Sequence, residues 1–167
     1  ERKLRDFFIE RRGQLRQEVD SEDKDRLLNY NETEYVEYLI AKHSIGPLVF
    51  HWDSVSVTDR EEEVEAGNRR FFRRQVITYH LPFSGLHKLL RFQPSRYITW
   101  TMEVEVRART VCFDIVNWDN DPSKVKRKAD ETQSRIEKLA DAVNRDLKSF
   151  NNNLETFASR VFKERKE

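Results

Sequence analysis

The sequence contains very little cysteine, glycine and proline, with one, four and four copies among 167 residues. The single cysteine, Cys112, has no partner for an internal disulfide and cannot support a zinc site built from several cysteines. This usage favours an intracellular, cytoplasmic protein. The sequence also lacks internal repeats and low-complexity linkers, so we expect one folded domain over residues 1–167.

Long apolar runs and an excess of either charge are also missing. No run approaches the roughly 18 apolar residues that span a bilayer, and no signal peptide is recognisable at the start. The chain has 31 lysines and arginines against 30 aspartates and glutamates, a formal charge of +1. Such a small net charge gives no general attraction to DNA or to an anionic membrane, so any such affinity must be local. We expect no membrane partner.

Recognisable catalytic and metal-binding motifs are absent as well. No two histidines are four residues apart, and no HExxH, G-x-S-x-G or Walker-type motif occurs. An acid–base pair of His80 and His87 with Asp114 is conceivable, but isolated histidines in strands are more often structural. The stretch "EVEVRART" places arginine where a metal nuclease needs lysine. We predict no catalytic residue, no metal site, no cofactor and no enzymatic activity for this chain.

Helical patterns occupy both ends of the sequence. Residues 2–19 carry a sparse apolar stripe on a charged background, which predicts a helix that needs a partner. Asn31 and Glu34 form a capping-box pattern that predicts a second helix, ended by Gly46 and Pro47. From Asp121 a "DPS" cap begins a predicted helix that continues to the end of the sequence.

The apolar positions of this last helix recur about every 3.6 residues, a period that predicts a straight helix lying on a core or bundle partner. These positions are 125, 129, 132, 136, 139, 143, 147, 150, 154, 157 and 161. At about 1.5 Å per residue the helix is too long for its distal half to rest on a small sheet. That half needs the N-terminal helix, a second copy of the chain or a following segment as its partner.

Strand patterns occupy the middle of the sequence. Residues 48–57 and 76–81 are predicted strands, and the acidic segment "DREEEVEAGN" is a predicted loop between them. Residues 98–107 alternate apolar and polar side chains, and residues 111–115 continue the apolar face, which predicts a hairpin over 98–118. The sequence therefore predicts an α+β fold, with an antiparallel sheet of about four strands flanked by helices and a long C-terminal α-helix. Within the single domain we distinguish an N-terminal helical arm (1–30), a core of helix plus sheet (31–120) and the terminal helix (121–167).

The most informative local feature is a stretch without acidic residues. It runs from Ala66 to Met102 and follows an acidic stretch at residues 53–65. Its seven cations are Arg69, Arg70, Arg73, Arg74, Lys88, Arg91 and Arg96. Together with interleaved aromatic rings they could bind a nucleic acid or another anion, because arginine binds phosphate and rings stack on bases. Alternatively, the basic stretch faces the acidic one and the rings belong to the core, which is the commoner arrangement.

A second candidate anion site is the turn "PFSG", which comprises Pro82, Phe83, Ser84 and Gly85. Its backbone amides could hold an anion with the help of Lys88. However, it has one glycine where a phosphate loop needs GxxxxGK[ST]. A turn that redirects the chain is the simpler interpretation.

Three stretches, "EYVEYLIAKHSIGPLVFHWDSV", "VITYHLPFSGLHKLLRFQPSRY" and "DLKSFNNNLETFASRVFKERKE", resemble an uncharacterised N-terminal module of bacterial proteins. The resemblance covers about residues 35–167 and departs from the module's pattern at Leu86 and Arg96, where an acidic residue and a threonine are usual. The matching residues are Pro82, Phe83, Ser84, Gly85, Pro94, Ser95, Asp146, Phe150 and Asn151.

In the proteins that carry this module, a domain that looks like a restriction-endonuclease-type nuclease follows it. The resemblance thus implies a role in bacterial defence or nucleic-acid processing, with any catalytic groups beyond Glu167. The absence of an initiator methionine and a helix that continues to the last residue also lead us to expect a fragment of a longer chain.

These observations predict a non-catalytic bacterial module that oligomerises through its long helix or senses a ligand, and that positions a downstream effector. The alternative is a nucleic-acid-binding module that uses residues 66–102. The expected partners are a second copy of the chain and, in the alternative, a nucleic acid.

Overall fold

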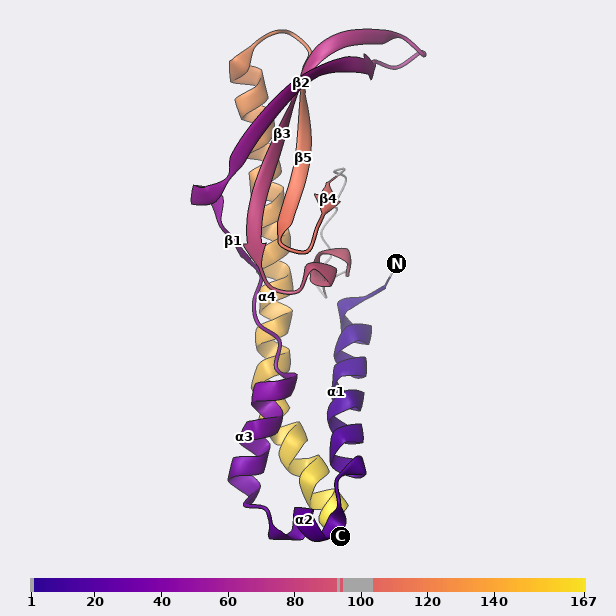
Figure 1. Cartoon of the computed structure of the whole chain (residues 1–167), viewed down its shortest axis with the longest axis vertical. Coiled ribbons are helices and arrows are strands. Elements are labelled where there is room, and N and C mark those ends of the chain that lie inside the picture. Colours follow the sequence, from indigo (N-terminus) through magenta and orange to yellow (C-terminus); the bar gives the residue numbers. More distant parts are fainter. Residues whose placement is uncertain (1, 93, 95–103) are drawn as a thin grey trace. The chain divides into compact units, whose positions relative to one another are not determined.

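The computed structural model describes residues 2–92, 94 and 104–167, and it confirms the predicted α+β fold (Figure 1). The elements in chain order are α1 (Leu4–Ser21), α2 (Lys24–Asn29), α3 (Glu32–His43), β1 (Val49–Phe50), the 3-10 helix η1 (Trp52–Ser54), β2 (Ser56–Glu65), β3 (Phe71–Ser84), the 3-10 helix η2 (His87–Arg91), β4 (Glu105–Val106), β5 (Thr110–Asn117) and α4 (Pro122–Lys166).

The chain forms two compact units. The helical unit comprises Glu1–Pro47, Arg91–Tyr97 and Ala142–Glu167, and the sheet unit comprises Leu48–Leu90 and Ile98–Asp141. Helix α4 contributes residues to both.

The sheet is antiparallel, and β3 is its central strand. Among the described residues the strand order is β1-β3-β5-β4, with β2 also paired to β3. β2 pairs with β3 along residues 71–80, whereas β5 pairs with β3 only along residues 75–82. The β2–β3 ribbon therefore continues past the end of β5, as Figure 1 shows. We call residues 61–74, which make up this extension and its turn, the hairpin arm.

The predicted acidic loop is wrong, because most of that segment forms β2. Its glutamates lie opposite the arginines of β3, with Glu62 across from Arg74 and Glu63 across from Arg73. Acidic residues disfavour strands in isolation, but opposite charges on facing positions stabilise the pairing of two strands. The strand thus depends on a register with a distant segment, and its own composition does not reveal it.

Other strand boundaries also differ from the predicted ones. The strand expected over 48–57 is divided in two, because η1 separates β1 from the first residues of β2. β3 continues to Ser84, so Pro82 and Phe83 belong to the strand instead of a turn. The alternating segment expected as a strand, 98–107, lies mostly outside the described residues. Its described end, β4, pairs with β5 as the predicted hairpin requires.

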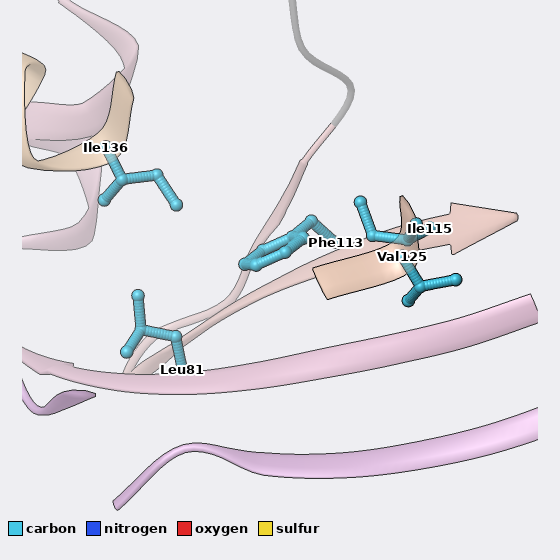
Figure 2. Close-up of a cluster of buried hydrophobic side chains, with 5 residues drawn as sticks. All are labelled: Leu81, Phe113, Ile115, Val125 and Ile136. Atoms are coloured by element: carbon cyan, nitrogen blue, oxygen red, sulfur yellow. The ribbon is translucent and has the colours of Figure 1, made fainter. Parts of the chain in front are cut away.

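One face of the sheet packs against the first half of α4. Leu81 on β3 lies on the same sheet face as Phe113 and Ile115 on β5, because alternate residues share a face. These three side chains form a buried cluster with Val125 and Ile136 of α4 (Figure 2). Positions 125 and 136 belong to the predicted apolar stripe of α4. The core of the sheet unit therefore forms where this stripe, with its 3.6-residue period, packs on the apolar face of the strands, where every second residue points to the helix.

In the helical unit, α1 runs parallel to the C-terminal half of α4. Near the start of α1, the ring of Phe8 stacks on Phe150 with centroids 4.7 Å apart. Further along, Arg16 Nη1 donates to Glu164 Oε2 at 3.1 Å. Residue numbers therefore increase together along the two helices.

Helix α3 runs antiparallel to the same part of α4. Tyr35, near the start of α3, contacts Phe162 with ring centroids 5.4 Å apart. Ile45, just after the end of α3, is held by Asn151 through two hydrogen bonds. The helical unit is thus a bundle in which α1 and α3 both pack on α4.

The starts of these helices follow the predicted capping rules. Asn31 is the N-cap of α3, and its Oδ1 accepts a hydrogen bond from Glu34 N at 3.1 Å. Asp121 Oδ1 accepts from Ser123 N at 3.0 Å, and α4 begins at Pro122 as predicted. Helix α2 begins at Lys24, three residues after α1 ends at Ser21.

The predicted apolar stripe of α4 is covered within the chain. Of its eleven positions, all except Ala129 and Phe157 are buried, and these two are half-buried. The distal half packs on α1, the N-terminal helix expected as one possible partner, and also on α3, which was not expected as a partner. The stripe therefore leaves no apolar face that a second copy would have to cover, so the observation that motivated oligomerisation through this helix is accounted for within one chain.

Candidate functional site

The predicted basic region is distributed over several elements. Arg69 and Arg70 lie in the turn of the hairpin arm, where Ala66 N donates to Arg70 O at 2.8 Å and Arg70 N donates to Gly67 O at 3.1 Å. Arg69 has a positive φ of 59°, which few residues other than glycine adopt, and this conformation belongs to the tight turn. Lys88 and Arg91 lie in η2, and Arg96 lies outside the described residues.

The two remaining arginines face the acidic strand. Arg73 Nε donates to Glu61 Oε2 at 3.2 Å across the ribbon. Arg74 Nε donates to Trp118 O at 3.1 Å, and its guanidinium lies over the ring of Phe72 at 5.3 Å. The acidic and basic stretches are therefore paired strands in the hairpin arm. This pairing leaves the basic strand beside carboxylates, which repel a nucleic-acid backbone.

The aromatic residues of this region differ in their burial. Phe71 and Phe72 are 61% and 39% exposed, so the expectation that these rings belong to the core is wrong for both. Phe92 is buried and stacks on Phe7 of α1 with centroids 5.2 Å apart. The exposed rings lie on the hairpin arm, where β2 is the one described strand that pairs with β3.

The predicted turn segment, residues 82–85, comprises the last three residues of β3 and Gly85, and its strand part pairs with β1. Pro82 O accepts a hydrogen bond from His51 N at 2.9 Å, and Ser84 Oγ lies 2.8 Å from His51 Nε2. Phe83 is buried, and Gly85 has a φ of 116°, which glycine tolerates. These contacts are those of paired strand ends, and only Gly85 lies in the bend that follows β3.

The opposite face of the sheet carries polar residues, including Asp114. Thr78 Oγ1 donates to Asp114 Oδ1 at 2.6 Å, and Arg60 Nη2 donates to Asp114 Oδ2 at 3.1 Å. Burial alone would raise the pKa of Asp114, but hydrogen bonds from Thr78 and Arg60 outweigh it and hold this pKa below its usual value. A carboxylate stabilised in this way is a poor general base.

A cysteine and a histidine lie beside this network. His80 Nδ1 is 3.4 Å from Cys112 Sγ, and His80 Nε2 is 2.9 Å from Thr58 Oγ1. The arrangement of Cys112, His80 and Thr58 matches that of a nucleophile, a base and a group that orients the base. However, burial raises the pKa of the Cys112 thiol, and the positive charge of Arg107 offsets this only in part. A protonated, buried thiol is unreactive.

The conceivable acid–base pair is therefore not assembled. His87 lies in η2, and no hydrogen bond described in the structure joins it to His80. Asp114 binds Arg60 and Thr78 instead of orienting either imidazole. The described residues of this face form a hydrogen-bonded network whose groups are not tuned for nucleophilic chemistry.

A different arrangement occurs in the helical unit, where two helix faces line a hollow of about 490 Å³. From α1 and the residue before it come Lys3, Arg5, Phe8 and Arg12, and from α4 come Asp146, Ser149, Phe150 and Asn153, with Pro94 also lining the hollow. On α1 the lining residues recur at i, i+3 and i+7, and on α4 at i, i+3, i+4 and i+7. Such spacings place side chains on one helix face, so two parallel faces meet at this site. We call it the basic pocket.

Aromatic stacking forms one wall of the basic pocket. The rings of Phe8 and Phe150 are nearly parallel, with an interplanar angle of 16°. The guanidinium of Arg12 lies over the ring of Phe150 at 5.4 Å, which positions that cation beside the rings. Phe150 is buried and Phe8 is half-buried, so Phe8 presents part of its ring to the pocket.

The charges of the basic pocket are mostly positive. Its lining includes three cations, Lys3, Arg5 and Arg12, and one carboxylate, Asp146. Lys3 and Arg5 are exposed, whereas Arg12 and Asp146 are half-buried. The volume is within the range of about 300–1,000 Å³ typical of small-molecule sites. Cations around an aromatic wall suit a ligand that combines negative charge with a planar ring.

Sequence reasoning missed this pocket because its two faces are about 140 residues apart. The available signal was the i, i+3, i+7 pattern of Arg5, Phe8 and Arg12, which places two cations beside an aromatic residue. Pro94, Asp146 and Phe150 are among the residues that match the bacterial module, but that resemblance assigns no function to them. Of the seven cations predicted as an anion site, the six that the structure describes do not line this pocket.

Within residues 2–92, 94 and 104–167, no three His, Cys, Asp or Glu side chains gather as metal ligands would. In the same part of the chain, no helix is long and apolar enough to cross a membrane. Comparison of the sequence with protein-family models and with curated proteins, and of the structure with solved structures, found no match.

Proposed function

We propose that this chain is a non-catalytic sensing module that binds a nucleoside phosphate in the basic pocket of its helical unit. The observation that carries the proposal is the meeting of Lys3, Arg5 and Arg12 with the stacked rings of Phe8 and Phe150. The bound phosphate would accept hydrogen bonds from the arginines, and the base would lie against the open part of Phe8.

The distribution of charge supports a phosphate more than a carboxylate ligand. Arginine presents a planar fork of donors that matches two phosphate oxygens, and Lys3 adds a mobile point charge. Asp146 on the opposite face provides an acceptor for the amino or hydroxyl groups that a nucleoside carries and a simple anion lacks. The pocket thus offers separate surfaces for the phosphate, the ring and the polar edge of one ligand.

The proposal of a non-catalytic role rests on the sheet unit. There the pKa of Asp114 is lowered and the pKa of Cys112 is raised, which are the wrong directions for a general base and a nucleophile. The pocket lining comes from α4 as well as α1. We propose that ligand binding steadies this pair of helices, and that α4 relays the change to a downstream effector in a bacterial, defence-related protein.

The test is isothermal titration calorimetry with AMP, ATP, adenosine and inorganic phosphate as probes. We expect AMP and ATP to bind at least tenfold more tightly than adenosine or phosphate alone, because only they engage both the cations and the ring. A 5′-phosphorylated oligonucleotide and its 5′-hydroxyl counterpart distinguish a free nucleotide from the end of a nucleic acid. Equal binding of all probes, or binding of none, would refute the proposed ligand class.

Substitutions test where the ligand binds. Arg5→Glu reverses an exposed pocket charge and should weaken AMP binding at least tenfold, about the effect of one charged hydrogen bond. Arg145→Glu makes the same change on an exposed position of α4 that does not line the pocket, and should leave binding within twofold. If both variants weaken binding equally, the ligand responds to net charge and the pocket is not its site.

The alternative, nucleic-acid binding through residues 66–102, stays a prediction. The salt dependence of binding to an unphosphorylated oligonucleotide would test it, because phosphate contacts impose a steep slope. The pairing of Arg73 with Glu61 gives it no support.

A further inference from the structure

One edge of β2 has no partner strand among residues 2–92, 94 and 104–167. Among the described residues β2 pairs only with β3, and β2 is exposed along nearly its whole length. Beyond Gln75, toward the turn of the hairpin arm, the ribbon consists of β2 and β3 alone among the described strands. A two-stranded ribbon is only marginally stable in water. A third strand on the free edge of β2 would complete the hydrogen bonding of the arm.

The direction of the free backbone groups follows from the pairing of β2 with β3. The hydrogen bond from Ala66 N to Arg70 O marks a hydrogen-bonded pair, and such pairs alternate along antiparallel strands. The outward-facing peptide groups of β2 therefore belong to residues 57, 59, 61, 63 and 65. The last four of these residues are acidic. Because alternate residues share a face, their carboxylates lie on one face of the sheet while their backbone N–H and C=O groups point outward from the edge: Asp59, Glu61, Glu63 and Glu65.

This row of carboxylates is only partly neutralised. Glu61 binds Arg73, and Asp59 accepts a hydrogen bond from Gln75 Nε2 at 2.8 Å. Glu63 and Glu65 have no ion pair among those in the described part of the chain. Next to them the ring of Phe71 lies opposite Glu65 and is 61% exposed. The end of the arm thus offers negative charge, free backbone groups and an exposed aromatic ring together.

We infer that this edge binds an extended segment of a partner protein that carries lysine or arginine at alternating positions. Its backbone would pair with the outward groups of β2, and its cations would lie opposite the carboxylates, where opposite charges stabilise a strand pair. A second copy is a poorer occupant, because β2 against β2 brings carboxylates together. A nucleic acid is repelled by the same row of charges.

The experiment uses fluorescence anisotropy with a labelled ten-residue peptide that alternates lysine with threonine. We expect it to bind the whole chain at low salt, and more weakly as salt rises. A peptide that alternates glutamate with threonine should not bind. The lysine peptide with N-methylated amides at every second residue keeps its charge but cannot donate to the edge, so its affinity should fall at least tenfold.

Paired variants locate the surface. Glu63→Lys with Glu65→Lys should weaken binding of the lysine peptide at least tenfold, and the milder pair Glu63→Gln with Glu65→Gln at least threefold. Glu37→Lys with Glu155→Lys makes the same charge change on exposed positions of α3 and α4 and should leave binding within twofold. Circular dichroism shows that each variant retains the fold.

Each result has a definite meaning. The proposal is overturned if the lysine peptide does not bind at low salt, because the edge then serves only to prevent strand pairing. Equal binding of the N-methylated peptide would show charge attraction without strand addition, and an equal loss in the control pair would place the peptide elsewhere. Concentration-dependent dimerisation that the Glu63 and Glu65 variants abolish would make a second copy the occupant and also overturn it.

Discussion

Asn151 holds the backbone of Ile45 through both ends of its amide. Its Oδ1 accepts from Ile45 N at 3.0 Å, and its Nδ2 donates to Ile45 O at 2.8 Å. The two residues are 106 positions apart, and the side chain satisfies both polar groups of one buried residue just after α3. This contact fastens the end of α3 to α4.

Replacing Asn151 by alanine should therefore destabilise the helical unit by about 1–3 kcal/mol, because both backbone groups of Ile45 lose their partner. Urea unfolding followed by circular dichroism measures the change. Asn152→Ala, one position along on the exposed side of α4, is the matched control and should stay within about 0.5 kcal/mol of the original. Equal changes in stability in both variants would mean that helix propensity is responsible, and not the hydrogen bonds between Asn151 and Ile45.

Tyr35→Phe should stabilise the protein. The Tyr35 hydroxyl is buried and has no hydrogen-bond partner among the described residues, whereas its ring stacks on Tyr30 at 5.1 Å and contacts Phe162. Phenylalanine keeps the ring contacts and removes the unpaired polar group, so we expect a gain of about 1 kcal/mol at pH 7. A loss of stability in thermal unfolding would show that the hydroxyl is bonded in solution.

The same hydroxyl predicts a loss of stability in alkali. Burial, followed by the negative charges of Glu18 and Glu22, raises the pKa of Tyr35 from 10 to about 12. Between these values the unfolded chain releases the proton and the folded chain keeps it, so stability falls as the pH rises from 10 to 12. Tyr35→Phe should flatten this part of the stability profile, and an unchanged profile would contradict the assignment.

Asp114→Asn should lower stability at neutral pH by about 1 kcal/mol, a value that allows for the solvent exposure of the carboxylate. Its pKa is depressed in the folded state, so its contribution is complete above the usual carboxyl value of 3.8 and disappears as the pH falls through the lower folded value. The difference between the two proteins should therefore vanish in acid. Asp141→Asn, on an exposed position of α4, should show no such pH-dependent difference.

The single thiol allows a direct measurement at the sheet face. Burial raises the pKa of Cys112, so iodoacetamide at pH 8 should alkylate the folded chain at least tenfold more slowly than the unfolded chain. Arg107 is the group that lowers this pKa, so Arg107→Gln should slow alkylation further. Arg109→Gln, an exposed neighbour, should not. Rapid alkylation of the folded chain would indicate a reactive thiolate.

The parts of the fold that the sequence predicts well depend on local patterns. The cap at Asn31 and the cap at Asp121 with Pro122 each lie within four residues of the helix that they start. The period at which apolar residues recur along α4 identifies the buried side of this helix directly. No long-range information is needed for either prediction, because the hydrogen bonds and the stripe belong to one helix.

The parts that the sequence does not reveal depend on distant residues. β2 is a strand because Glu62 and Glu63 face Arg74 and Arg73, and neither segment alone indicates that register. The basic pocket depends in the same way on Arg12 meeting Phe150 across most of the chain. Single-sequence patterns identify the cations and the rings, but not which of them meet.

The division of the chain into units has a consequence for its synthesis. The helical unit is assembled from three separated segments, and α1 cannot pack on its partner until the ribosome has made residues beyond 150. The sheet unit needs only residues 48–141 and can form earlier, while the nascent α1 and α3 still lack the C-terminal half of α4. We therefore expect the sheet to fold first during translation and α1 to remain open to chaperones and proteases until the last turns of α4 emerge.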